Sequence, residues 1–159
     1  MSNRYGSRSL EAIDTVDPHL RLVFETLLPH FDHSVLVGER TRADQDAAVA
    51  GGKSKTPWPT SGHNNPCRAC RGAGCGFCRS TGEVVEVRDK LFPRGARALD
   101  VMPYPLDWDD FARIRYFAGW VMATARSVGV ELVWGGDWDG DTNLGDQTFN
   151  DLVHFELSD

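Results

Sequence analysis

Two CxxC pairs near the middle of the chain constrain its fold most. Cys67 and Cys70 form the first pair, and Cys75 and Cys78 form the second. Four thiolates at this spacing complete a closed tetrahedral zinc site, which leaves no position open for water and is therefore structural. The binding free energy of such a metal folds a segment that is too small to have a core of its own.

The length and composition are those of a globular protein. The chain has 159 residues, of which 41% are hydrophobic and 25% are charged. This is enough chain for one domain with a continuous apolar core and too little for two ordinary domains. We expect a single domain over residues 1–159, in which residues 64–95 are an insert that contains the four cysteines.

The N-terminal segment, residues 1–10, is polar and lacks the apolar stretch of a secretory signal. No stretch of the sequence is apolar for long enough to span a bilayer, so we expect no membrane insertion. These features predict a protein that is made and kept in a cytoplasm. Thiols stay reduced there, which favours zinc ligation of the cysteines over the alternatives, two disulfides or free thiols.

The formal net charge of -6 argues against negatively charged partners. Proteins that bind nucleic acid or anionic lipid through broad electrostatic attraction usually carry positive charge, so we expect no nucleic-acid partner. Basic residues do gather locally, either as a patch that faces a polymer or as a solvated surface. They are Arg68, Arg71, Arg79, Arg88, Lys90, Arg94 and Arg97.

Apolar spacing and capping residues predict alternating helices and strands. Helices are expected over residues 18–28, after Asp17 as N-cap; over residues 41–51, after a capping box at Thr41; and over residues 108–127, after Asp107 as N-cap. Strands are expected over residues 34–38, 83–88, 97–102, 130–134 and 152–157. This mixed order indicates an α+β fold with a small, mostly antiparallel sheet flanked by helices.

Several short fragments occur in a characteristic order along the chain. They are Gly38-Glu39-Arg40-Thr41, Gln45, Gly52-Lys53-Ser54-Lys55, Ser61-Gly62-His63, Ala96-Arg97-Ala98-Leu99-Asp100, Trp134-Gly135-Gly136-Asp137-Trp138 and Asp151-Leu152-Val153-His154-Phe155-Glu156-Leu157. Together they resemble the VanY-type D-alanyl-D-alanine carboxypeptidases and, more closely, the phage L-alanyl-D-glutamate endolysins of the same zinc peptidase family. The resemblance covers residues 9–157 apart from the cysteine insert.

The resemblance implies a catalytic zinc ion. In the family, one histidine and an aspartate lie in a Ser-x-His-x-x-Gly-x-Ala-x-Asp motif, and a second histidine closes an Asp/Glu-x-x-His motif. Carried over, His63, Asp100 and His154 are the zinc ligands and Asp151 is the general base. Here the segment between His63 and Asp100 is greatly expanded, but both halves of the first motif remain at its ends, so the added residues can form a loop outside the site.

The residue types fit the chemistry independently. Hydrolytic zinc sites use three nitrogen or oxygen ligands and keep a position for water, whose proton a nearby carboxylate such as Asp151 can accept. Arg40 could hold a substrate carboxylate or stabilise an oxyanion, as the resemblance also suggests; the alternative is a buried ion pair. Ser61 and Gln45 are candidates for substrate contact or for support of the ligands.

Two further groups leave alternatives open. Trp134 and Trp138 either line the substrate groove or belong to the core. The acidic residues 137–143 alternate like the first half of a calcium loop, but Thr142 replaces the glycine of the turn and Thr148 replaces the final glutamate. This segment is either a weak calcium site or a solvated turn.

The cysteine insert has a resemblance of its own. Its two CxxC pairs and the glycines after them are similar to the CxxCxGxG repeats of the DnaJ cysteine-rich domain, where two such knuckles share one zinc ion. The second copy lacks the first of its two glycines. The insert therefore implies a structural zinc ion in addition to the catalytic one.

The sequence thus predicts a monomeric zinc peptidase that acts on peptidoglycan, with the L-alanyl-D-glutamate bond as the preferred target. Its phage-like form predicts that it stays in the host cytoplasm until another protein disrupts the membrane and then reaches the cell wall or periplasm. One alternative is D-alanyl-D-alanine carboxypeptidase activity. Another is a non-catalytic zinc-binding interaction module, against which Asp151 argues because a structural site needs no base.

Overall fold

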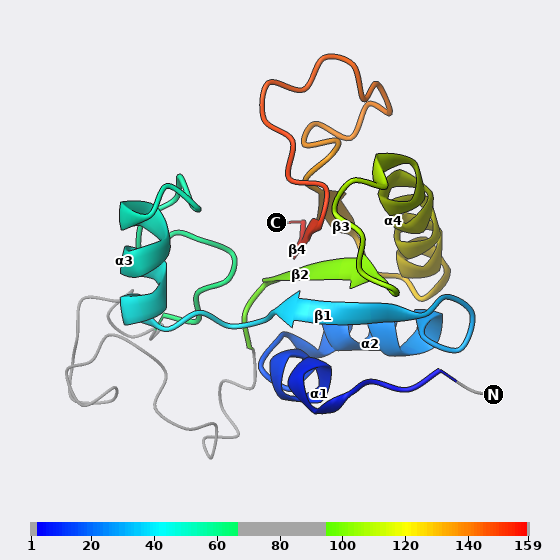
Figure 1. The fold of residues 1–159 in the computed structure, drawn as a ribbon, viewed down its shortest axis with the longest axis horizontal. Helices are drawn as coiled ribbons and strands as arrows, with labels where there is room; N and C mark the ends of the chain where they lie inside the picture. Colours follow the sequence, from blue (N-terminus) through cyan, green and yellow to red (C-terminus); the bar gives the residue numbers. More distant parts are fainter. Residues whose placement is uncertain (1–2, 67–94, 159) are drawn as a thin grey trace.

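A computed structural model describes residues 3–66 and 95–158 of the chain. Over these residues the fold is α+β, with four helices and a four-stranded antiparallel sheet (Figure 1). The predicted fold class is confirmed in this form. The four cysteines with their predicted zinc knuckle, and the predicted strand at residues 83–88, lie outside the described residues.

The chain forms eight described elements. The helices are α1 (Ser7–Ile13), α2 (Pro18–Leu27), α3 (Arg42–Ala50) and α4 (Phe111–Ser127), and the strands are β1 (His33–Val37), β2 (Ala98–Pro103), β3 (Leu132–Trp134) and β4 (His154–Leu157). The strand order is β1-β2-β4-β3, so the last strand of the chain lies inside the sheet, between β2 and β3. None of the described helices has both the length and the apolar character that crossing a bilayer requires.

Two helices begin at the residues that the sequence predicts. The side chain of Asp17 accepts the backbone N–H of His19 at the start of α2, and that of Thr41 accepts the N–H of Asp44 at the start of α3. Each cap satisfies one of the backbone donors that the first turn of a helix leaves without an intrahelical partner.

The predicted start of α4 is wrong by one turn. Asp107 accepts the N–H of Asp109 in a turn before the helix, and α4 begins only at Phe111. Asp110 is the N-cap, and it accepts the N–H of Arg113. Asp107, Asp109 and Asp110 all offer acceptors for the first turn of a helix, and the sequence alone does not decide among them.

Helix α1 was not predicted, because its seven residues carry little local signal. Its N-cap, Gly6, has no side chain to accept a hydrogen bond. The helix is instead held by tertiary contacts: Ser9 Oγ accepts the N–H of Val35 at 3.1 Å, and Ile13 is fully buried in the core. Short helices generally depend on such packing.

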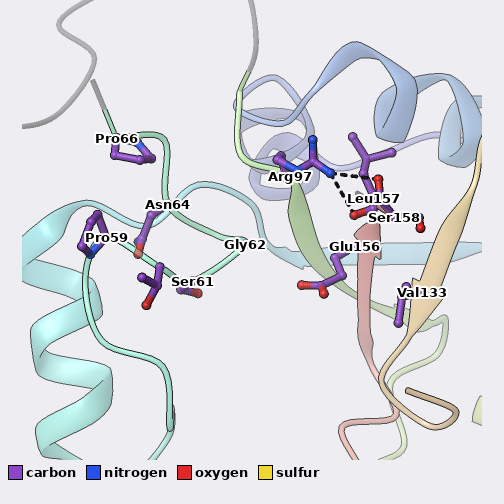
Figure 2. Close-up of a pocket in the computed structure, with 11 residues that line it drawn as sticks. Pro59, Ser61, Gly62, Asn64, Pro66, Arg97, Val133, Glu156, Leu157 and Ser158 are labelled. Atoms are coloured by element: carbon purple, nitrogen blue, oxygen red, sulfur yellow. Dashed lines mark hydrogen bonds between the residues drawn. The ribbon is translucent and has the colours of Figure 1, made fainter. Parts of the chain in front are cut away.

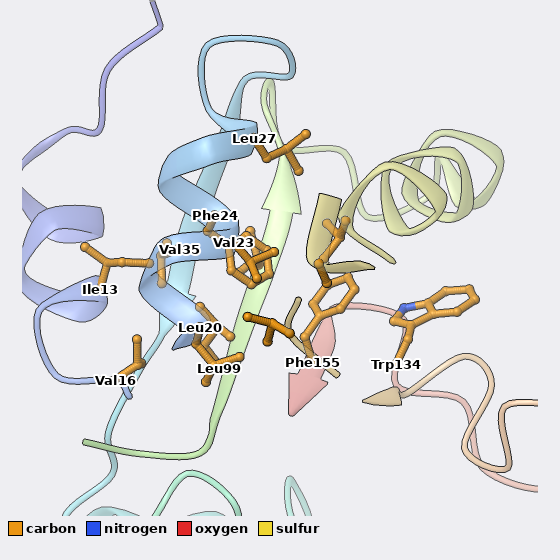
Figure 3. Packing of buried hydrophobic residues seen from close by; sticks show 14 of the residues in the cluster. Ile13, Val16, Leu20, Val23, Phe24, Leu27, Val35, Leu99, Trp134 and Phe155 are labelled. Atoms are coloured by element: carbon orange, nitrogen blue, oxygen red, sulfur yellow. The ribbon is translucent and has the colours of Figure 1, made fainter. Parts of the chain in front are cut away.

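One face of the sheet carries the hydrophobic core. Leu20 and Phe24 of α2 face Leu99 of β2 and Phe155 of β4 in the middle of this core (Figure 3). Helix α4 closes the same cluster with a stripe of buried residues, namely Ile114, Phe117, Ala118, Val121 and Ala125. Burial of these apolar side chains is the main force that holds α2 and α4 on the sheet.

The opposite face of the sheet carries polar side chains. Because side chains alternate along a strand, Asp100 points away from the core to which its neighbours Leu99 and Val101 belong. His154 pairs directly with Asp100 across β2 and β4 and lies on the same face. This polar face, hereafter the open face, positions the candidate site.

The loop that follows α3 lies against the open face. The backbone N–H groups of Arg97 and Ala98 both donate to the carbonyl of Gly62, at 2.8 and 2.9 Å. The N–H of Arg40 donates to the carbonyl of His63 at 2.8 Å. These backbone hydrogen bonds fix the segment that carries His63 at the start of β2, close to Asp100.

Candidate metal centre

Three side chains from distant parts of the chain converge on the open face. His63 Nε2 lies 3.1 Å from Asp100 Oδ1 and 3.2 Å from His154 Nδ1, and the last two atoms are 3.2 Å apart. All three residues are buried, and each is at most 8% exposed. The structure therefore brings together the three residues that the sequence predicts as zinc ligands.

The outer nitrogen of each imidazole has a hydrogen-bond acceptor. His63 Nδ1 lies 2.9 Å from the carbonyl oxygen of Gly38, and His154 Nε2 lies 3.2 Å from the carboxylate oxygen Oε2 of Glu156. Since a carbonyl or carboxylate oxygen only accepts, these nitrogens carry the protons in the neutral rings. His63 Nε2 and His154 Nδ1 are then left with lone pairs that face each other and Asp100.

This arrangement fits a zinc ion. Two lone pairs and a carboxylate oxygen at such short separations repel one another unless a cation lies between them. Nitrogen and oxygen ligands at about 2.0–2.1 Å from tetrahedral zinc are about 3.3–3.4 Å apart, close to the observed separations. The donor set of two imidazoles and one carboxylate is that of a hydrolytic site, which keeps a fourth position for water.

Arg40 contacts the outer oxygen of the central carboxylate. Its Nη2 donates to Asp100 Oδ2 at 3.1 Å, while Asp100 Oδ1 faces the two histidines. The ion pair is largely buried, with side-chain exposures of 20% for Arg40 and 11% for Asp100. The pair orients the carboxylate, in agreement with the ion-pair alternative for Arg40; a direct role in catalysis stays a prediction.

Protons on the inner ring nitrogens can also satisfy Asp100, and the pKa values of the cluster reflect this second arrangement, in which both histidines hydrogen-bond Asp100. Burial raises the pKa of Asp100, but its hydrogen bonds with His154 and His63 outweigh burial and hold this pKa well below the ordinary value. Burial lowers the pKa of His154, whereas its hydrogen bonds with Asp100 and Glu156 raise it to about 9. Both shifts show that the site favours positive charge.

Asp151 is close enough to the three converging residues for their charges to act on its carboxyl. Burial raises the pKa of its carboxyl above the ordinary value, and the negative charge of Asp100 adds to the rise. The backbone carbonyl of Asp151 accepts the N–H of His154 at 3.0 Å, which ties both residues into one turn. A Cβ on Gly135 would lie 2.3 Å from this carbonyl, so only glycine allows the turn to pack here.

Ser61 and Gln45 support the loop that carries His63. The Oγ of Ser61 lies 3.4 Å from the N–H of His63. Gln45 is fully buried, and its Nε2 donates to the Ser54 hydroxyl at 2.9 Å and to the Thr56 carbonyl at 2.6 Å. These contacts favour the supporting role over substrate contact for Gln45.

The two tryptophans have different surroundings. Trp134 is 6% exposed within the core cluster, and its Nε1 donates to the Leu152 carbonyl, so the core alternative is favoured for it. Trp138 lies at the site, with its ring centroid 5.4 Å from that of His154. The ring of Phe149 stacks on that of Trp138, with the two centroids 6.1 Å apart, so Trp138 contacts aromatic rings of both Phe149 and His154.

The acidic loop brings three carboxylates together. Oxygen atoms of Asp137, Asp139 and Asp141 lie within 4.8 Å of one another. Each carboxylate also accepts a hydrogen bond from within the loop, from Thr142 N, Gln147 Nε2 and Asn143 N respectively. Thr142 has a φ of 73°, the left-handed conformation for which a calcium loop uses glycine. Calcium binding stays a prediction.

Glu156 is the residue of the site to which the sequence reasoning gave no role. It follows His154 by two positions in β4, and alternation along a strand places residues i and i+2 on the same face. This spacing was the available signal. Hydrogen bonding between His154 and Glu156 lowers the pKa of the Glu156 carboxyl below its ordinary value.

Comparisons with known proteins support this picture. The family model of the phage L-alanyl-D-glutamate peptidases matches residues 80–158, just under half of the chain. The crystal structure of the L-Ala D-Glu endopeptidase ChiX of Serratia marcescens is similar, with a TM-score of 0.57 and 24% sequence identity over 98% of this chain and 91% of that chain. No curated protein sequence matches. The family match supports the predicted resemblance, and the structural match shows a common fold.

Proposed function

We propose that this protein is a zinc-dependent peptidase that cleaves the stem peptides of peptidoglycan. The observation that carries the proposal is the convergence of His63, Asp100 and His154 on the open face, with facing atoms 3.1–3.2 Å apart. The resemblance to the phage L-alanyl-D-glutamate peptidases supports the same activity and substrate.

The three converging residues would hold the zinc ion through His63 Nε2, Asp100 Oδ1 and His154 Nδ1. When bound, zinc polarises a peptide carbonyl and lowers the pKa of a water molecule to about 7. Asp151 would accept a proton from this water, and its raised pKa suits a group that would then donate the proton to the leaving amine. Arg40 keeps the Asp100 carboxylate oriented throughout.

The preferred scissile bond is the L-alanyl-D-glutamate bond. The matching family model and the similar crystal structure are both described by cleavage of this bond. Within the phage-lysis setting of that family, the enzyme would reach the wall once the membrane has been disrupted.

Digestion of purified peptidoglycan tests the proposal. The expected result is the release of fragments with new amino termini, and mass spectrometry should identify glutamate at those termini. The His30→Ala variant, which lacks an exposed histidine outside the site, should digest peptidoglycan as the wild type does. Intact peptidoglycan after incubation with zinc-loaded protein, under conditions in which the protein is folded, would contradict the proposal.

Metal content separates this proposal from a non-catalytic zinc-binding module. An enzyme with a catalytic site and a cysteine knuckle binds about two zinc ions per chain, whereas a module binds one through its cysteines alone. His63→Ala should remove one of the two ions. An unchanged zinc content in this variant favours the module.

A further inference from the structure

The carboxylate of Glu156 lies behind one of the proposed metal ligands. Its Oε2 is 3.2 Å from His154 Nε2, on the side of the imidazole ring opposite Nδ1, the nitrogen that faces His63 and Asp100. The side chain is 33% exposed, whereas that of His154 is 10% exposed. The carboxylate thus contacts the ring from the rim of the site.

Gly62 leaves room for this carboxylate. A Cβ at Gly62 would lie 2.8 Å from Glu156 Oε2 and 2.9 Å from the Cβ of Ala98, both closer than ordinary contacts allow. Figure 2 shows Glu156 extending from β4 toward the loop that holds Ser61 and Gly62. A side chain at position 62 would therefore displace the Glu156 carboxylate or push the loop away from Ala98 of β2.

The same carboxylate lines a solvent-accessible pocket. The pocket has a volume of about 390 Å³ and lies between the loop of residues 59–66, Val133 of β3 and the C-terminal end of β4 (Figure 2). Arg97 borders it and donates to the carbonyl oxygens of Leu157 and Ser158, which fixes the end of β4. Because β4 also pairs with β2 on one side and with β3 on the other, the backbone that carries Glu156 is firmly held.

We propose that Glu156 is a positioning residue that orients His154 for metal binding, with Gly62 providing the space that this contact needs. A carboxylate that accepts the outer N–H of a ligating imidazole fixes its tautomer and ring orientation and makes the inner nitrogen a better donor. Its hydrogen-bond contact within the site is with His154 Nε2, so we expect it to act through His154. This inference rests on the proposed function.

Zinc affinity, measured by competition with a chromophoric chelator, tests the inference. Glu156→Ala should raise the zinc Kd about 10–100-fold, the usual effect of losing such a partner. Glu156→Gln, whose amide oxygen still accepts a hydrogen bond but carries no charge, should raise it less. Glu131→Ala is the matched control, since Glu131 is an exposed glutamate just before β3, and its Kd should stay within about twofold of wild type.

The His63→Ala variant shows which zinc ion belongs to this site. Zinc binding by the cysteines would not require His63, so the ion that this variant loses is the one held with His154. Cobalt in the same site provides a second readout, as the difference spectrum between each variant and His63→Ala. A misoriented His154 changes the visible absorption of the cobalt, whereas a loss of affinity through general destabilisation leaves the spectrum of the loaded site unchanged. Glu156→Asp, whose carboxylate is one methylene shorter, takes the place of Glu156→Ala if the latter does not fold.

The inference is overturned by a Kd within twofold of wild type in Glu156→Ala, or by a raised Kd with an unchanged cobalt spectrum. A wild-type protein without a His63-dependent zinc site refutes the proposed function itself. A wild-type protein that has this site, together with an unaffected Glu156→Ala variant, refutes only the role of Glu156.

Discussion

The two faces of the sheet are built by the same strands but differ in polarity and in the contacts that their side chains make. On one face, Leu99 and Phe155 are fully buried among the apolar side chains of α2 and α4. On the other face, their immediate neighbours Asp100 and His154 point at each other and at His63. One face stabilises the fold through apolar burial, and the other holds a buried cluster of charge that favours a cation.

The comparison shows how a small fold can contain a site whose buried charges are destabilising. Buried charges are destabilising unless they are paired or bind metal. Here Asp100 and His154 are each adjacent in sequence to a core residue, Leu99 and Phe155 respectively, so apolar packing on one face holds the strands in place for the polar face. Substitutions on the two faces should therefore have separable effects, on activity and on stability.

The largest effect is expected for His154→Ala. The variant should lose the His63-dependent zinc ion and at least about 10³-fold of the activity, because zinc contributes several kcal/mol to stabilisation of the transition state. Zinc content and peptidoglycan digestion measure the two effects. His30→Ala should be unchanged in both; a His154→Ala protein that retains activity would contradict the assignment of the open face.

Asp151→Asn should lower kcat about 10²–10⁴-fold and leave the zinc content unchanged, because the amide cannot accept a proton. Steady-state digestion of peptidoglycan fragments measures kcat. Asp109→Asn, at an exposed aspartate outside the site, is the matched control. Loss of zinc together with activity would instead make Asp151 part of the metal site.

On the core face, Phe155→Ala should lower the free energy of unfolding by about 3–5 kcal/mol, because it leaves a cavity between α2 and the sheet. Phe155 is fully buried, whereas Phe111 is 52% exposed, so Phe111→Ala should cost far less. Denaturant unfolding measures both. Below its unfolding transition, Phe155→Ala should keep its zinc ion; loss of the ion from a folded variant would show that the two faces are not separable.

A smaller effect is expected from His33, a buried histidine on the core side. Burial lowers the pKa of His33 to about 4. The unfolded chain, with a pKa near 6.5, then binds a proton that the folded chain does not, so stability is complete above about pH 6.5 and falls as the pH is lowered toward 4. The loss should be about 2 kcal/mol between pH 7 and pH 5.

Unfolding of wild type and His33→Asn at both pH values measures this effect. The Tyr5 hydroxyl lies 2.7 Å from His33 Nε2, and His33 Nδ1 donates to the carbonyl of Phe31. The variant alters both contacts and therefore loses some stability at either pH. Its pH dependence, however, should be about 2 kcal/mol weaker than that of wild type. Equal pH dependence in both proteins would remove His33 as the cause.

Sequence reasoning predicted the elements that carry strong local signals. The cap at Asp17 and the apolar spacing after it predicted α2, and the family resemblance carried by the short motifs predicted that His63, Asp100 and His154 would converge. Motifs of this kind constrain a site because its chemistry requires particular residue types. The predicted convergence holds even though many residues separate His63 from Asp100.

The features that sequence reasoning missed depend on tertiary contacts. Helix α1 forms because Ser9 and Ile13 pack against the rest of the domain, and no local pattern reveals that contact. The role of Glu156 depends on which nitrogen of His154 faces the site. The environment of Trp134 depends on which side of β3 faces the core, and so short a strand leaves this undecided in the sequence.

The central claim is that two imidazoles and a carboxylate on the open face share one metal ion. Anomalous diffraction at the zinc absorption edge, from crystals of the zinc-loaded protein, tests it most directly. We expect a peak about 2.0–2.1 Å from His63 Nε2, Asp100 Oδ1 and His154 Nδ1. Anomalous density elsewhere in an active, zinc-loaded protein, with none between these three atoms, would contradict the claim.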